Sequence, residues 1–447
     1  MMKTILQHHF SGKLLLSSEI PLTPMELEQN LQQQLISPLP SIVDGTCQRC
    51  GNNQMASFPC IICRTQCSYC RHCIDMGRVT SCQPLYKWSG ADVLWEPSKR
   101  SRLTWDGTLS SPQQEASDQV VRTIVSKGSL LVWAVCGAGK TEVTFKGIDR
   151  ALMRGDRVCF ATPRTDVVLE LAPRLRRAFK GIEVAALYGG GEDMGKATQL
   201  VVTTTHQLYR FKQAYDTMIV DEIDAFPYSY DRSLQHAVQA ARKSTSALIQ
   251  LTATPSKHQI RTHPFIRIPA RFHGYPLPLP EFKWCGNWQK SIEKERIPRV
   301  ILQWVNQRLM DQTPIMLFFP SIKHMLAALP LFQQLNRHCL SVHAEDRERK
   351  EKVMKLREGR CPLLLTTTIL ERGVTISGVD VGVVGAEDDQ FTESALVQIA
   401  GRVGRKKESP AGNVTFFHFG KSLAMERAYL HIDDMNNEGR RKGLLHP

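Results

Sequence analysis

The segment Ala134–Thr141 constrains the fold of this 447-residue chain more strongly than any other feature of its sequence. It reads Ala-Val-Cys-Gly-Ala-Gly-Lys-Thr, directly follows an apolar run and precedes a stretch with helical spacing. Glycines at such a junction let backbone N–H groups wrap phosphates at a helix N-terminus. The sequence therefore predicts an ATP site in which Lys140 reaches the β- and γ-phosphates and Thr141 holds Mg²⁺. The nucleotide-binding residues of this loop are Gly137, Ala138, Gly139, Lys140 and Thr141.

Short apolar runs alternate with helical stretches on both sides of a Pro-rich break at residues 268–280. This alternation indicates parallel, doubly wound sheets, so we expect an α/β fold with two lobes. The strand candidates are residues 130–135, 158–162, 200–204, 218–220 and 248–251, and then 315–319, 363–367, 379–384 and 414–419. The expected organisation is an N-terminal segment (1–45), a cysteine-rich module (46–84), a first lobe (106–275), an interlobe linker (276–296) and a second lobe (297–447).

The strand candidate at residues 218–220 ends in a cluster of carboxylates that begins with Asp221 and Glu222. In such a fold Asp221 would complete the Mg²⁺ shell, and Glu222 would orient and deprotonate the attacking water. An ordinary acidic surface loop is the alternative interpretation. The position of the cluster, half a domain after the phosphate loop, favours the catalytic one.

The net charge of +14 indicates which kinds of partner the chain attracts. A cationic surface attracts polyanions such as nucleic acid, although a basic chain can also be merely soluble. No apolar run approaches the roughly 18–20 residues that span a bilayer, and the N-terminus carries no secretion signal. We expect a cytoplasmic protein, with any membrane association made through a partner.

Eight of the 13 cysteines fall between Cys47 and Cys82. Clustered thiols in a reducing compartment are typical of metal ligands, and CxxC pairs can bind one tetrahedral Zn²⁺ from a tight turn. Eight thiols suffice for two sites, and the spacing does not determine how they pair. The preferred first zinc site is Cys47, Cys50, Cys70 and Cys73, and the second is Cys60, Cys63, Cys67 and Cys82. Sites closed by four cysteines are structural and not catalytic.

Several motifs of the first lobe resemble, in order, those of superfamily-2 helicases. Gln113, with Gln114 as the alternative, resembles the upstream glutamine that reads adenine. Residues 161–164 and 203–207 resemble the motifs that contact the DNA backbone. Residues 252–254 resemble the motif that couples hydrolysis to lobe closure. The resemblance implies two RecA-like lobes.

Two further motifs of the same set lie in the second lobe. Residues 366–373 are similar to the fifth motif, which places Gly373 among the nucleotide-binding residues, although Thr375 stands where many relatives have Asp. Residues 398–405 resemble the sixth motif, which implies that Arg402 and Arg405 reach ATP across the cleft. A guanidinium that arrives only when the lobes close would stabilise charge on the transferring phosphoryl group.

The position of the cysteines separates two helicase families. In the PriA family of replication-restart helicases the zinc cysteines interrupt the second lobe, whereas here they precede the phosphate loop. The arrangement resembles the ComFA family of late competence ATPases. That resemblance implies an ATPase stimulated by single-stranded DNA. Such a motor would help to pull transforming DNA through a membrane channel, together with other competence proteins, at the inner face of the cell membrane.

Two rival hypotheses remain open. The chain could be a PriA-like restart or repair helicase that unwinds duplex DNA. It could instead be a zinc-dependent DNA- or protein-binding adaptor whose nucleotide site only switches conformation. The presence of Glu222, Arg402 and Arg405 argues against the adaptor, because a pure switch does not need the hydrolytic residues.

Overall fold

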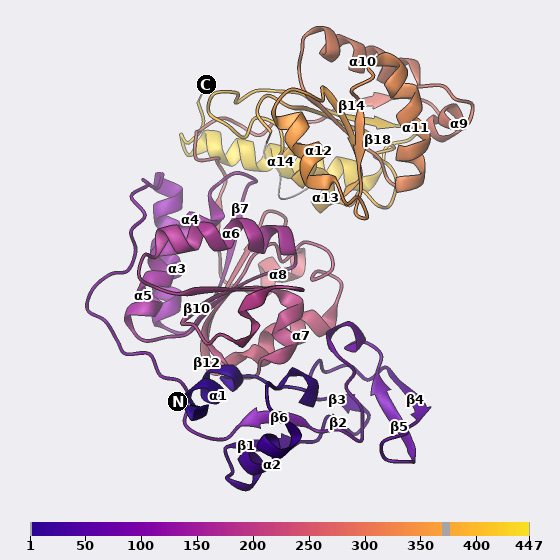
Figure 1. Cartoon of the computed structure of the whole chain (residues 1–447). Coiled ribbons are helices and arrows are strands. Elements are labelled where there is room, and N and C mark those ends of the chain that lie inside the picture. Colours follow the sequence, from indigo (N-terminus) through magenta and orange to yellow (C-terminus); the bar gives the residue numbers. More distant parts are fainter. Residues whose placement is uncertain (1, 369–375, 447) are drawn as a thin grey trace. The chain divides into compact units, whose positions relative to one another are not determined.

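The computed structural model describes residues 2–368 and 376–446, and it divides into two compact units (Figure 1). The first unit comprises residues 1–132 and 141–266, and the second comprises residues 133–140 and 267–447. Each unit is built around one β-sheet. The α/β class with two doubly wound parallel sheets, predicted from the alternation of apolar runs, is confirmed.

The sheet of the first unit has seven strands in the order β13-β7-β12-β11-β8-β10-β9. The pairs β11–β12, β11–β8, β10–β8 and β10–β9 are parallel. Its strands are β7 (Ser129–Ala134), β8 (Val158–Thr162), β9 (Val184–Leu187), β10 (Leu200–Thr204), β11 (Tyr215–Val220), β12 (Arg242–Thr252) and β13 (Phe265–Ile268). The central strands are buried on both faces, as expected for a parallel sheet covered by helices.

Helices cover this sheet because each presents one apolar stripe to it. In α6, for example, Val168, Leu171 and Leu175 recur at helical spacing and are buried, while Arg176 and Arg177 at the end of the helix are exposed. The helices are α3 (Ser111–Val125), α4 (Lys140–Val143), α5 (Phe145–Met153), α6 (Thr165–Ala178), α7 (Arg232–Ala241) and α8 (Lys257–Thr262), with 3₁₀ turns η3 (Glu192–Gly195) and η4 (Thr205–Arg210).

The second unit has a six-stranded, fully parallel sheet in the order β14-β19-β18-β15-β17-β16. Its strands are β14 (Glu281–Trp284), β15 (Ile315–Phe318), β16 (Leu340–Val342), β17 (Leu363–Thr366), β18 (Asp380–Val384) and β19 (Val414–His418). Its helices are α9 (Trp288–Glu293), α10 (Arg299–Met310), α11 (Ile322–Leu335), α12 (Arg349–Arg357), α13 (Glu393–Ala400) and α14 (Leu423–Arg441).

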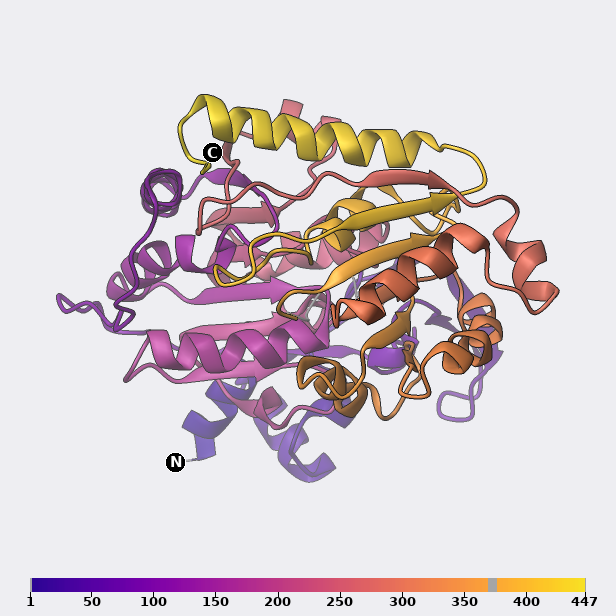
Figure 2. The same ribbon diagram turned by 90° about the horizontal axis from the view of Figure 1, so that it is seen from above.

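The segment expected to link the lobes, residues 276–296, contains regular structure. It forms the edge strand β14 and the short helix α9. Figure 2 shows α14 running beside β14, and the rings of Phe282 and Tyr429 lie 5.9 Å apart there. Within the described residues, none of the helices combines the length and apolarity that a membrane span needs.

The first 88 residues form a small region that is part of the first unit. Its elements are α1 (Met2–Phe10), η1 (Ser17–Glu19), α2 (Pro24–Gln32), β1 (Ile36–Leu39), β2 (Ile42–Val43), β3 (Thr46–Cys47), β4 (Met55–Pro59), β5 (Gln66–Cys70), η2 (Ile74–Met76) and β6 (Leu85–Trp88). Strand β1 pairs antiparallel with β6 over a cluster that includes Phe10, Leu15 and Ile36. The N-terminal segment therefore folds together with the cysteine-rich module that follows it.

Candidate functional site

The phosphate loop connects β7 to the short helix α4, whose first residue is Lys140. Gly137 and Gly139 have φ values of 83° and 71°, which side chains with a Cβ rarely adopt. These two glycines let the loop turn tightly between the strand and the helix. Thr141 is buried in the first turn of α4, where a hydroxyl can reach a cation beside the phosphates.

The carboxylate cluster follows the end of β11, in the same parallel sheet as β7. Oδ1 of Asp221 accepts a hydrogen bond from the backbone N–H of Glu222 at 2.8 Å. Glu222 has a φ of 54°, a left-handed conformation that is strained for a residue with a side chain and that recurs at functional sites. Its side chain thus projects from a tight turn directly after the strand.

Asp224 joins this cluster to the Thr-Ala-Thr motif at the end of β12. Its Oδ1 accepts a hydrogen bond from Oγ1 of Thr252 at 2.7 Å, and its Oδ2 accepts one from Oγ1 of Thr254 at 2.9 Å. Carboxylate acceptors make the stronger class of hydrogen bond, so the two motifs are held in fixed register. This pairing gives a physical route from the carboxylates expected to act in hydrolysis to residues 252–254.

The two segments expected to contact DNA backbone also follow strand ends of the first sheet. Residues 161–164 include the last two residues of β8 and the turn that follows it. In this turn Arg164 forms an ion pair with Asp166 at 3.0 Å. Residues 203–207 run from β10 into η4, and burial lowers the pKa of His206 below its ordinary value. A neutral imidazole at this position is available to donate or accept one hydrogen bond.

Gln113 is buried in the first turn of α3, and its Oε1 accepts a hydrogen bond from the backbone N–H of Ser110 at 2.7 Å. The residue therefore takes part in a capping box of the helix. Gln114 instead lies between Asp118 and Lys146, to which its side chain is hydrogen-bonded. The adenine-reading role of either glutamine stays a prediction.

The arginines of the sixth motif lie in the second unit, in the turn that follows α13. Arg402 is buried, and Nε of Arg405 donates to the carbonyl of Gly401 at 2.9 Å. The buried Arg271, which the sequence did not single out, also donates to Gly401 and to Gly404, at 3.3 and 2.6 Å. Burial lowers the pKa of Arg271 to about 10. Gly373 and Thr375 lie outside the described residues.

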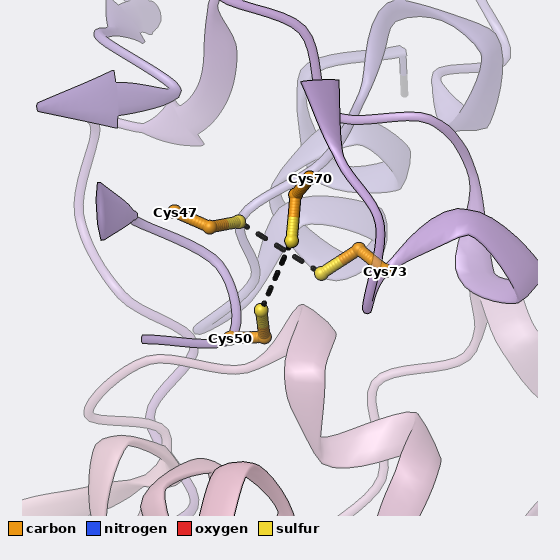
Figure 3. Close-up of side chains that lie close together, drawn as sticks. All are labelled: Cys47, Cys50, Cys70 and Cys73. Atoms are coloured by element: carbon orange, nitrogen blue, oxygen red, sulfur yellow. Dashed lines mark hydrogen bonds between the residues drawn. The ribbon is translucent and has the colours of Figure 1, made fainter. Parts of the chain in front are cut away.

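The first cysteine quartet comprises Cys47, Cys50, Cys70 and Cys73, all fully buried (Figure 3). The Sγ atoms of Cys47 and Cys73 are 3.8 Å apart, and those of Cys50 and Cys70 are 3.6 Å apart. Four thiolates at about 2.3 Å from a tetrahedral Zn²⁺ would be separated by about 3.8 Å. The arrangement of the sulfur atoms therefore fits one zinc ion closed on all sides by protein.

The second quartet comprises Cys60, Cys63, Cys67 and Cys82, of which Cys63 and Cys82 are only partly buried. Cys60 and Cys63 lie in the turn between β4 and β5, and the Sγ atoms of Cys60 and Cys82 are 3.7 Å apart. The turn carries Ile61 and Ile62, which are 94% and 72% exposed. The structure thus brings the cysteines together in the two groups that the sequence suggested, and zinc ligation stays a prediction for both.

The first quartet contacts η4, which contains the end of the segment expected to bind DNA backbone, residues 203–207. Nε2 of His72, between Cys70 and Cys73, lies 3.0 Å from Oη of Tyr209 in η4 and 3.3 Å from Oδ2 of Asp231. Asp231 also caps α7, accepting from the backbone N–H of Ser233. These contacts could not be predicted from the sequence, since nothing in the spacing of His72 indicates a partner more than 130 residues away.

A second connection runs through the partly buried carboxylate of Glu19. It accepts hydrogen bonds from Arg49, between Cys47 and Cys50, at 2.7 and 2.8 Å, and from Nε of Arg210 at 2.6 Å. Burial alone would raise the pKa of Glu19, but the charges of the two arginines outweigh that effect and hold it below its ordinary value. Glu19 therefore joins the first CxxC turn to the end of η4.

Three parts of the chain match known families. Residues 1–87 match the competence protein ComFA N-terminal domain. Residues 106–257 match the type III restriction enzyme, res subunit, and residues 296–407 match the helicase conserved C-terminal domain. Both units thus carry helicase domains, which imply the use of ATP and Mg²⁺.

Solved helicase structures share the fold at low sequence identity. RecG bound to a three-way DNA junction aligns with a TM-score of 0.53 and 16% identity, covering 77% of this chain and 49% of that chain. Dbp5 of S. cerevisiae bound to RNA and ADP BeF3 aligns with a TM-score of 0.53 and 14% identity, covering 74% and 92%. At these identities the likeness concerns the fold alone.

Two relatives match almost end to end. The competence protein ComFA of Bacillus subtilis (strain 168) is 48% identical over 443 residues, covering 96% of this chain and 95% of the relative. The competence protein ComFA of Streptococcus pneumoniae (strain ATCC BAA-255 / R6) is 37% identical over 399 residues, covering 88% and 90%. The chain belongs to the competence protein ComFA family.

Proposed function

We propose that the chain is an ATP-dependent translocase that moves along single-stranded DNA and drives the uptake of transforming DNA during natural competence. One observation carries the proposal: a hydrolytic residue set follows the strands of the first sheet in a chain of the ComFA family. Lys140 begins the helix after β7, and Glu222 follows β11. A DNA-binding adaptor that used its nucleotide only as a switch would not need Glu222.

The chemistry divides among named residues. Gly137, Ala138 and Gly139 would wrap the phosphates with backbone N–H groups, and Lys140 would neutralise them. Mg²⁺, when held by Thr141 and Asp221, offsets phosphate charge. Glu222 would take the proton of the attacking water, and Arg402 and Arg405 would stabilise the charge that develops on the transferring group. Gln113 would contact the adenine, and Gly373 the nucleotide.

The two cysteine quartets would each hold a structural Zn²⁺, because four thiolates leave no open position for a substrate. The first quartet lies against the segment after residues 203–207, so its metal would stabilise a DNA-contacting part of the motor. The partners of the working protein would be single-stranded DNA, a membrane DNA channel and other competence proteins. Its place would be the inner face of the cell membrane.

Displacement of streptavidin from a biotinylated single strand tests translocation directly. The wild-type chain should release streptavidin in the presence of ATP and Mg²⁺, and Lys140→Ala should not. Equal release without ATP, or no release at a saturating concentration of protein, would contradict the proposal. Unwinding of blunt duplex DNA at a rate comparable to displacement would favour a restart or repair helicase.

A further inference from the structure

The loop between the hydrolytic carboxylates and α7 presents an unusual pair of side chains. Phe226 and Tyr230 are 73% and 71% exposed, the two most exposed aromatic side chains in the part of the chain that the structure describes. Their ring centroids lie 6.4 Å apart with an interplanar angle of 50°. Exposing large apolar rings to water costs free energy. A pair of such rings therefore indicates a site that binds a ligand.

This loop, defined here as residues 225–231, is held in a fixed conformation. Backbone hydrogen bonds join Ser229 to Ala225 at 3.0 Å and Tyr230 to Pro227 at 3.1 Å. Between the two exposed rings, Tyr228 is buried, and its carbonyl accepts a hydrogen bond from Gln235 of α7 at 3.1 Å. These contacts fix the backbone that carries the two exposed rings.

Both ends of the loop are tied to elements of the motor. It starts one residue after Asp224, whose carboxylate bonds the hydroxyls of Thr252 and Thr254. It ends at Asp231, whose carboxylate lies 3.3 Å from His72, which in turn lies 3.0 Å from Tyr209 of η4. The loop is therefore held beside the segment that follows residues 203–207, the expected DNA-backbone contact.

We propose that Phe226 and Tyr230 form a stacking platform for the unpaired bases of single-stranded DNA. Aromatic side chains stack on every base, because each base has a π-face, so the platform would bind without regard to sequence. The exposed Arg232 directly after the loop adds a positive charge for a neighbouring phosphate. This inference rests on the proposed function and deepens it, since it names the bases of the strand as a ligand.

The position of the platform also explains how DNA could stimulate hydrolysis. Phe226 is four residues after Glu222, and Ala225 donates its backbone N–H to the carbonyl of Glu222 at 2.8 Å. A base that stacks on Phe226 therefore restrains the segment that carries the catalytic carboxylate. Inside a duplex, where each base pair is stacked on both sides, the bases offer no free faces to the platform.

The test compares two ligands of equal charge: a thymidine oligonucleotide and an abasic phosphodiester strand of the same length. The wild-type chain should bind the thymidine strand more tightly, and only that strand should stimulate ATP hydrolysis strongly. Phe226→Ala, Tyr230→Ala and the double substitution should each weaken thymidine binding roughly 5- to 100-fold per ring. Their affinity for the abasic strand and their basal hydrolysis should not change.

Two controls accompany these variants. Tyr230→Phe keeps the ring and should retain wild-type affinity, and Phe419→Ala removes an exposed aromatic side chain of the second unit and should have no effect. Equal wild-type affinity for the two strands would overturn the platform, and so would full thymidine affinity in the double variant. In either case, if single-stranded DNA still stimulated ATP hydrolysis, the proposed translocase function would not be contradicted. A wild-type chain that binds no single strand would overturn both.

Discussion

The two cysteine quartets share their chemistry but differ in how they connect to the rest of the first unit. The sulfur atoms of each lie within 4.8 Å of one another. The first quartet is buried in the same hydrophobic cluster as Leu208 of η4 and as Tyr215 and other residues of the seven-stranded sheet. Two cysteines of the second quartet, Cys60 and Cys63, lie in the turn of the β4–β5 hairpin, where Ile61 and Ile62 are exposed. The hairpin lies at the edge of the unit (Figure 1). The first quartet is therefore part of the core of the first unit, whereas the second lies outside that core, around the β4–β5 hairpin.

The largest difference is expected between Cys50→Ser and Cys82→Ser. Loss of zinc from the first quartet would leave three buried thiols in the core of the unit, which should lower the free energy of unfolding by about 4 kcal/mol. The same loss from the second quartet should lower it by about 1–2 kcal/mol, because only the hairpin loosens. Chemical denaturation and elemental analysis measure both effects. Equal destabilisation by the two variants would show that the quartets are equivalent.

A smaller effect is expected from Glu19→Gln, which keeps the shape of the side chain but removes the charge between Arg49 and Arg210. The buried guanidinium of Arg49 and the partly buried one of Arg210 would lose their counter-charge, at a cost of about 2–3 kcal/mol. The exposed Glu28 in α2 offers the control, since Glu28→Gln should change stability by less than about 0.5 kcal/mol. If Glu19→Gln and Glu28→Gln had the same free energy of unfolding, the ion pairs of Glu19 with Arg49 and Arg210 would not stabilise the first quartet's region.

The same carboxylate predicts a pH dependence. The pKa of Glu19 is lowered in the folded chain, so its contribution to stability is complete above the ordinary value of 4.5. That contribution should disappear as the pH falls through the lowered pKa, because the protonated carboxyl no longer pairs with the arginines. Below that pH the wild-type chain and Glu19→Gln should unfold at similar denaturant concentrations. A difference between them that persists unchanged on acidification would argue that the charge of Glu19 is not what matters.

His72→Ala removes the contacts of the first quartet with Tyr209 and Asp231. The loss of these hydrogen bonds at a partly exposed site should reduce stability by about 1 kcal/mol. Because Tyr209 follows the expected DNA-backbone motif, stimulation of hydrolysis by single strands should fall while basal hydrolysis is retained. Ile74→Ala, in the same turn, is the matched control. A parallel loss of basal and stimulated rates would indicate general damage and not a role in the response to DNA.

The smallest effect is expected at the tip of the second quartet. Ile61→Ser and Ile62→Ser replace side chains that are already in water, so the free energy of unfolding should change by less than about 0.5 kcal/mol. Zinc content should also remain that of the wild-type chain. A large loss of stability in either variant would place the hairpin tip inside the core and contradict the contrast between the quartets.

Much of the fold could be predicted from local sequence, for a physical reason. Parallel strands buried on both faces must be continuously apolar, so residues 158–162 and 200–204 could be identified to the residue. Strand β14 has alternating charged and aromatic residues at an edge of its sheet, and its pattern does not differ from that of a loop. The sequence alone therefore predicts a linker at these residues.

The candidate site divides in the same way. The phosphate loop and the Asp221–Glu222 pair need fixed local geometry, and their residues are contiguous in sequence. The ion pairs of Glu19 join it to residues 30 and 191 positions away, and only the fold brings them together. The exposure of Phe226 and Tyr230 is likewise a tertiary property, because the sequence around them also suits a buried aromatic turn.

Steady-state ATP hydrolysis of the wild-type chain and of Glu222→Gln, with and without single-stranded DNA, tests the motor assignment most directly. The wild-type rate of ATP hydrolysis should rise severalfold when single-stranded DNA is added. This stimulation should fall steeply as the salt concentration rises, because binding to the DNA backbone releases counterions. Glu222→Gln should bind ATP but hydrolyse it on the order of 10²–10⁴-fold more slowly, because the catalytic base is lost. A wild-type rate indifferent to DNA, or a Glu222→Gln rate equal to that of the wild type, would contradict the account.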